Sequence, residues 1–271
     1  MNTTEAQRSS VQAPADYLLH LADNALILGQ RNAEWCGHGP IIEEDLSMAN
    51  NALDLIGQAR LLYQYAAQIV GGGATEDSLA YFRDVPDFRN YTLLELPHSP
   101  PLAATARGDR DYATTIVRNF LYSALMVLLW ERLTASADRQ LAAIAARSLK
   151  ESHYHLRHSR DWLVRFGDGT DESHDRAQAA LDHLLPYTDE FWADSAAEQA
   201  ALTQGVGVSV AALRTDWNAL VDDALKEATL NRPVAARGYI TQGKQGVHSE
   251  HLGFVLSEMQ SLARAHPGAS W

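Results

Sequence analysis

The stretch LAAIAARSLKESHYHLRHSRDWLVRF, residues 141–166, contains no glycine or proline and is long enough for an extended α-helix. At ~100° per residue, side chains spaced three or four positions apart fall on one face of such a helix. That face carries Ile144, Ser148, Glu151, His155, His158, Trp162 and Phe166. The apolar residues on this face predict that it points toward the core. The carboxylate of Glu151 and the imidazoles of His155 and His158 would then also point toward the core. Ionisable groups rarely lie in a core unless they are paired or bind a metal.

Composition narrows the classes of protein to which this chain can belong. It has 271 residues, of which 46% are hydrophobic, so a sizeable core is expected. The net charge of −12 argues against binding to nucleic acid or to anionic membranes. Cys36 is the only cysteine, which excludes an internal disulfide and a thiolate metal cluster.

The first 14 residues are polar, lack an apolar signal core and are predicted to form a disordered tail. The most apolar run, residues 120–130, is flanked by charged residues and is too short to span a bilayer. We therefore expect a soluble, cytoplasmic protein with no membrane partner.

The rest of the chain, residues 15–271, is predicted to form a single all-α domain of about seven helices. Four long helices are expected at residues 16–35, 43–70, 111–134 and 138–166. Further helices are expected at 170–185, 213–232 and 249–266, with loops at 195–210 and 231–247. The long helices are joined by a short, a long and a short connection, the pattern of a ferritin-like four-helix bundle.

The second long helix carries two neighbouring rows of side chains. The apolar row of Leu46, Ala49, Leu53 and Ile56 has the spacing of a core stripe. The polar row beside it is Glu43, Ser47, Asn50 and Asp54. This register predicts that Asn50 and Asp54 lie close to the bundle centre.

A ferritin-like di-iron site needs a carboxylate from each of two helices and a Glu-x-x-His from each of the other two. The second long helix offers no histidine, and residues 112–130 of the third contain no acidic residue. In the fourth helix, Glu151 is followed three residues later by Tyr154, and His155 lies one position further on. One incomplete half-site cannot hold two irons, so we predict a degenerate site with no metal ligands and no catalytic residue.

Two interpretations of the centre remain open. A mononuclear metal site could use Glu151, His155 and a carboxylate from Asp54 or Asp23. We favour a buried hydrogen-bonded polar centre that replaces the metals, because such a network is tolerated when its members satisfy one another. Its predicted members are Asp23, Asn50, Asp54, Glu151 and His155. His158 is expected to be a core imidazole, and Asn119 and Ser123 to serve packing.

Basic residues in the predicted 231–247 loop raise a further possibility. Arg232, Arg237 and Lys244 could bind phosphates, for example those of a CoA thioester, but a solvated loop is the simpler interpretation.

Several long segments together resemble a known family, the PaaC subunits of the bacterial phenylacetyl-CoA ring epoxidase. They are YLLHLADNALILGQRNAEWCGHGP (17–40), EEDLSMANNALDLIGQARLLYQYA (43–66), LAYFRDVPDFRNYTLLELP (79–97), ARSLKESHYHLRHSRDWLVRFGDGTDESHDR (146–176) and GVHSEHLGFVLSEMQSLARAHPGASW (246–271). The segments span nearly the whole chain in the expected order. The resemblance implies a ferritin-like fold and a role in phenylacetic acid catabolism.

The resemblance also implies that this chain is a structural subunit of a monooxygenase complex. In that family the di-iron chemistry belongs to a paralogous catalytic subunit, which forms a heterodimer with the PaaC-type chain. A small bridging subunit and a reductase with NADPH, FAD and an iron–sulfur centre complete the system, and an isolated chain could form a homodimer. The alternative is a self-sufficient metal-dependent oxygenase with a modified mono- or di-iron site.

Overall fold

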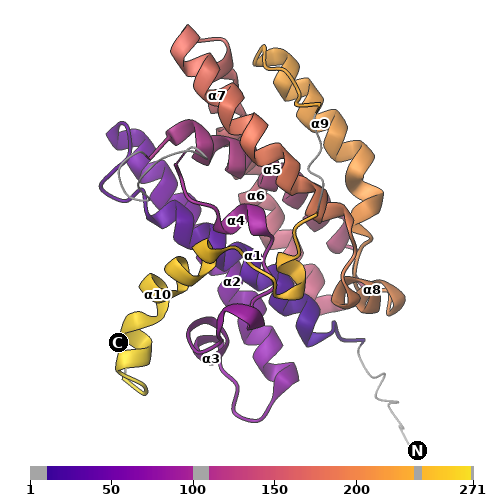
Figure 1. Ribbon diagram of the computed structural model, residues 1–271. Helices are drawn as coiled ribbons and strands as arrows, with labels where there is room; N and C mark the ends of the chain where they lie inside the picture. The colour runs from indigo at the N-terminus through magenta and orange to yellow at the C-terminus, as the bar shows by residue number, and fades with distance from the viewer. Residues whose placement is uncertain (1–10, 100–109, 235–239, 270–271) are drawn as a thin grey trace, which may run out of the picture.

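The computed structural model describes residues 11–99, 110–234 and 240–269. Within these ranges the chain forms α-helices and short 3₁₀ helices, and no β-strand is present (Figure 1). The helices are α1 (Ala15–Ala33), α2 (Ile42–Val70), α3 (Glu76–Tyr81), α4 (Thr92–Glu95), α5 (Tyr112–Leu133), α6 (Arg139–Gly167), α7 (Asp171–Leu184), α8 (Ala196–Thr203), α9 (Arg214–Glu227) and α10 (Glu250–Ala265). The 3₁₀ helices are η1 (Val85–Asp87), η2 (Leu185–Trp192), η3 (Val210–Leu213) and η4 (Gly243–Gln245). The all-α prediction is confirmed.

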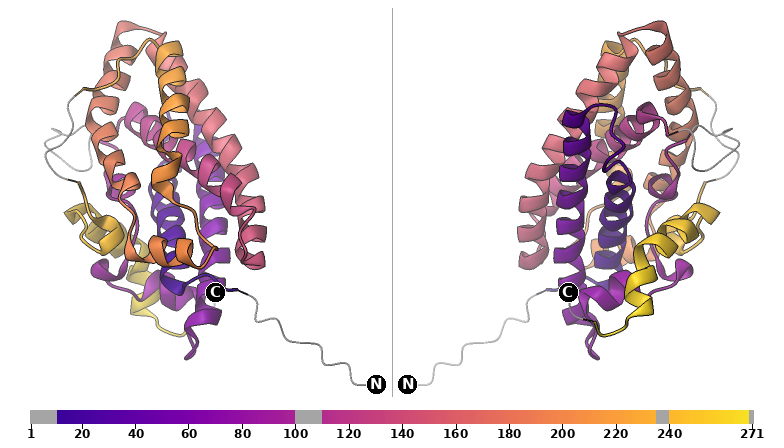
Figure 2. Two further views of the ribbon diagram at one scale, coloured as in Figure 1. Left: turned by 90° about the vertical axis from the view of Figure 1, so that its right-hand side faces the viewer. Right: turned by 90° about the vertical axis from the view of Figure 1, so that its left-hand side faces the viewer.

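The long helices α1, α2, α5 and α6 form the bundle. α1 packs along α2, α5 packs along α6, and α2 and α6 close the arrangement (Figure 2, right). The long connection between α2 and α5 carries only the short helices α3, η1 and α4, and Pro86 and Pro97 within it are incompatible with the interior of a long helix. α7 and α9 cover α5 and α6 on the other side of the molecule (Figure 2, left).

α5 is the central helix, because nearly all of its residues are buried and it packs against α6, α7 and α9. It is also long and apolar enough to cross a membrane, but 94% of its most apolar window is buried inside the protein. Burial of this kind is typical of the core helix of a bundle.

Helix ends follow local capping chemistry. The carboxylate of Asp138 caps α6 by accepting from the amides of Gln140 and Leu141 at 2.9 and 3.0 Å. Its second oxygen accepts from the hydroxyl of Tyr65 and from the amide of Ala13. Ala13 is buried, although it lies in the segment that the sequence predicts to be a disordered tail; residues 1–10 of that segment lie outside the described ranges.

One expected loop contains a helix. Residues 195–210 include α8, which begins at the capping box formed by Ser195 and Glu198. The Ser-x-x-Glu pattern of this capping box is visible in the sequence, and Gly205 and Gly207 lie beyond the end of the helix.

The expected core stripe of α2 is wrong in its register. Leu46, Leu53 and Ile56 are exposed, with exposed fractions of 58%, 67% and 37%. The inward face of the helix consists of Met48, Ala52, Leu55, Ala59 and Leu62. Both rows have helical spacing, so the choice between them depended on packing against α1 and α6.

Candidate functional site

The centre of the bundle is lined by small polar side chains of α6. Ser148, Ser152, His155 and Ser159 are all buried and lie along one face of this helix. The hydroxyl of Ser159 donates to the backbone carbonyl of His155 at 2.7 Å. A serine hydroxyl can satisfy itself within its own helix in this way, so it needs no ion as a partner.

His155 contacts one of its predicted partners. Its Nε2 lies 3.1 Å from a carboxylate oxygen of Asp54 on α2. The imidazole is buried, whereas the Asp54 side chain is 39% exposed. The pair therefore lies at the edge of the bundle and opens toward solvent.

Glu151 contacts α2 at a separate point. Its Oε2 accepts from the side-chain amide of Gln58 at 2.9 Å, and Oε1 lies 3.4 Å from Arg147. Its side chain is 21% exposed.

The prediction of one buried network of five residues is wrong. Asn50 is exposed because the register of α2 turns it outward, and Asn51 takes the buried position. Asp23 is fully buried but belongs to a cluster with Tyr63, Arg83 and the backbone amide of Arg89. Two separate contacts between α2 and α6 remain. Glu151 bonds Gln58, and His155 bonds Asp54.

Two further polar contacts between the bundle helices were not predicted. The side-chain amides of Asn32 on α1 and Asn119 on α5 donate to each other, both at 3.1 Å. Near one end of the bundle, Glu44 on α2 accepts from the hydroxyl of Tyr112 at 2.6 Å and lies 2.8 Å from Nε2 of His158. Burial, followed by the hydrogen bond to Glu44, raises the pKa of Tyr112 well above its ordinary value.

The donor set does not fit a pair of iron ions. Divalent iron in this fold needs several carboxylates and an imidazole for each metal. Within the described ranges, no three side chains from His, Cys, Asp and Glu come together in a way that could hold a metal ion. On α5, Asn119 contacts Asn32 of α1, and Ser123 is buried.

A second buried cluster surrounds the loop before α10. Lys244 was expected in a solvated loop, but it is buried and its ammonium lies 2.9 Å from Glu198. His20 lies 3.7 Å from the other oxygen of Glu198. Burial lowers the pKa of His20, so the ring is neutral at pH 7 and Lys244 balances the carboxylate.

The same loop is anchored by a buried imidazole–carboxylate pair. His248 Nδ1 lies 2.8 Å from Glu95, whose other oxygen accepts from the amide of Ser249. Burial alone would lower the pKa of His248, but the hydrogen bond and charge of Glu95 outweigh it, so the pKa is raised.

Arg232, another basic residue expected in that loop, already has side-chain partners. Arg232 pairs with Asp222 and Asn218 of α9. Arg237 lies outside the described residues.

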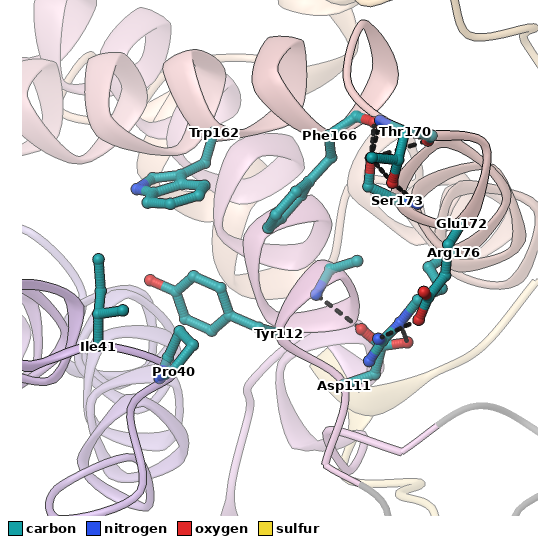
Figure 3. A pocket seen from close by; sticks show the side chains of 11 residues that line it. Pro40, Ile41, Asp111, Tyr112, Trp162, Phe166, Thr170, Glu172, Ser173 and Arg176 are labelled. Carbon is teal, nitrogen blue, oxygen red and sulfur yellow. Dashed lines mark hydrogen bonds and ion pairs between the residues drawn. The ribbon is translucent and has the colours of Figure 1, made fainter.

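A hollow of about 370 Å³ opens where the segment before α2 meets the start of α5 and the end of α6 (Figure 3). The rings of Tyr112, Trp162 and Phe166 and the side chain of Ile41 point into it. Tyr112 and Trp162 meet edge to face with ring centres 5.9 Å apart. On the polar side, Arg176 pairs with Asp111 at 3.2 Å. An aromatic hollow of this kind suits an apolar group better than an ion.

Two comparisons with known proteins agree with each other. Residues 1–271 match the model of the PaaA/PaaC family, described as phenylacetic acid catabolic protein. The chain is also 45% identical over 255 residues to a subunit of the 1,2-phenylacetyl-CoA epoxidase of Escherichia coli strain K12. The aligned region covers 94% of this chain and 98% of that protein.

Proposed function

Because this chain belongs to the PaaA/PaaC family of phenylacetic acid catabolic proteins, we propose that it is a non-catalytic, structural subunit of a phenylacetyl-CoA epoxidase. In this proposal it binds and stabilises a catalytic ferritin-like subunit in the cytoplasm. The catalytic subunit holds the di-iron centre, and this chain carries no cofactor of its own. A small bridging subunit and a reductase with NADPH, FAD and an iron–sulfur centre supply the remaining functions.

The chemistry of the bundle centre carries the proposal. The inward face of α6 presents hydroxyls and one imidazole, and α1 and α5 present the amide pair of Asn32 and Asn119. The carboxylate that contacts His155 is that of Asp54, which is partly in solvent. Hydroxyl and amide groups can line the centre of a bundle, but they do not neutralise two divalent ions.

The rival function is a self-sufficient metal-dependent oxygenase. The His155–Asp54 pair, with Glu151 one turn away, is the arrangement that favours it. However, one oxygen of Glu151 already accepts a hydrogen bond from Gln58. Glu151 and His155 therefore belong to two different contacts between α2 and α6 and do not share a partner.

Co-expression with the catalytic subunit of the same epoxidase tests the proposal. We expect a stable complex in which elemental analysis assigns the iron to the catalytic subunit. The isolated chain, titrated with ferrous ion without oxygen and then desalted, should retain less than about one iron per ten chains, because its centre lacks the carboxylates that the metals need. Retention of one or two irons per isolated chain, or the absence of any complex, would overturn the assignment.

A further inference from the structure

An apolar row on α2 is largely exposed in the described chain, and only its last member, Ile56, packs against α1, beside Gly29. Ile42, Leu46 and Leu53 are 68%, 58% and 67% exposed, and Ile56 is 37% exposed. With the half-buried Ala49, these residues occupy positions 42, 46, 49, 53 and 56 of one 29-residue helix. We refer to these five residues as the α2 seam.

The spacing of the α2 seam is that of a helix–helix contact. Steps of four, three, four and three residues place apolar side chains along a straight line that a second helix can follow. The sequence pattern therefore has the form of a buried stripe. In the described chain, however, most of these side chains are exposed to solvent. A continuous exposed apolar row of this kind is typical of a surface that another protein covers.

Gly57 supplies an independent observation on the same face. It lies one turn beyond Leu53 in the interior of α2, and a Cβ placed there would meet no described atom within 4 Å. Glycine inside a helix costs ~0.5–1 kcal/mol relative to alanine. Nothing in the described part of the chain explains that cost, whereas the close approach of a second helix would, because a missing side chain lets two backbones come together.

The aromatic hollow continues the α2 seam at its N-terminal end. Ile41 lines the hollow and directly precedes Ile42, the first seam residue (Figure 3). Tyr112, Trp162 and Phe166 form its apolar wall. A helix that follows the seam could place an apolar side chain in this hollow as an anchor, a common feature of interface centres.

We propose that the α2 seam and the aromatic hollow form the docking surface for one long helix of the catalytic subunit. This inference rests on the function proposed above, since the similar E. coli protein is one subunit of an epoxidase. The seam is flanked by Glu43, Asp45 and Asp54, so the facing part of the partner helix should be neutral or basic. A second copy of this chain is a poorer occupant, because two chains of charge −12 repel each other.

The test compares full-length variants co-expressed with a tagged catalytic subunit. Leu53→Arg places a charge within the seam. Leu202→Arg is the matched control, because Leu202 is 44% exposed on α8, which faces away from α2 (Figure 2). Gly57→Leu adds a side chain where the described chain leaves open space.

Dissociation of each purified complex on dilution is followed by sedimentation velocity. We expect Leu53→Arg to raise the Kd of the complex at least about 30-fold, the size of a central interface residue. Gly57→Leu should also weaken the complex while raising the melting temperature of the isolated chain. The Leu202→Arg complex should match the wild type, and all isolated variants should keep their helical circular dichroism.

Three outcomes would overturn parts of the argument separately. If the wild-type chain forms no complex, the proposed function fails. If the wild type forms the complex and Leu53→Arg leaves its Kd unchanged, the docking surface is wrong and the proposed function stands. If the isolated wild type is a dimer that Leu53→Arg separates, while the complex is unaffected, the occupant is a second copy.

Discussion

Asp23→Asn should be one of the most damaging single-atom changes in this protein. The carboxylate is fully buried on α1 and bonds both terminal nitrogens of the Arg83 guanidinium. It also accepts from the Tyr63 hydroxyl at 2.5 Å and from the Arg89 amide at 2.8 Å. The cluster connects α1 and α2 to the crossover between α2 and α5.

The expected loss follows from this geometry. Asparagine keeps one acceptor oxygen and turns an NH₂ group toward donors, so the guanidinium loses its charge partner. Removing one partner of a buried ion pair costs about 3–5 kcal/mol, because the other charge stays buried and unpaired. The Arg83 side chain is 13% exposed, which lets some water reach it and places the expected loss near the lower end, about 3 kcal/mol.

Urea unfolding followed by circular dichroism measures this loss as a lower midpoint with an unchanged m-value. Arg83→Met and the double variant complete a double-mutant cycle. We expect the double variant to be less destabilised than the sum of the single variants, by about 2 kcal/mol. A loss below about 1 kcal/mol for Asp23→Asn, or strictly additive effects, would refute the view of a tightly coupled buried pair.

Three further predictions concern other sites. His98 is buried, and burial, followed by the charge of Arg118, lowers its pKa from 6.5 to about 4. The unfolded chain therefore binds this proton at a higher pH than the folded chain, and stability should fall by roughly 3 kcal/mol as the pH drops from about 6.5 to about 4. Thermal unfolding across this range checks it, and a flat profile that His98→Gln does not alter would contradict it. Gly167→Ala should destabilise the fold by more than about 3 kcal/mol, because the new Cβ would overlap the carbonyl oxygen of Ala228. Gly57→Ala is the control. It should be neutral or stabilising, because the space around Gly57 is open. Glu151→Ala should shift the urea midpoint by the equivalent of less than about 1 kcal/mol, because that side chain is 21% exposed and water can replace it as the partner of Gln58; a larger shift would mean that the contact is more strongly coupled than its exposure indicates.

Local chemistry was sufficient to predict the long helices of this chain. Residues 141–166 contain no glycine or proline, and Asp138 and Thr170 cap the helices that follow them. The connection between α2 and α5 is long in the sequence itself. Each of these features involves residues that are close together in the chain. The lack of an acidic residue in the middle of α5 could likewise be read directly, because it depends on residue type and not on position in space. These signals do not depend on what packs against them.

The rotation of α2 and the pairing of buried charges depended on the folded chain. α2 carries two rows with helical spacing, and only the surfaces of α1 and α6 select Met48 and Leu55 over Leu46 and Leu53 as its inward face. Partners of Asp23, Glu198 and His248 lie 40, 46 and 153 residues away in the sequence. Side chains that far apart meet only after the bundle has closed, and no local propensity encodes which acid will face which base.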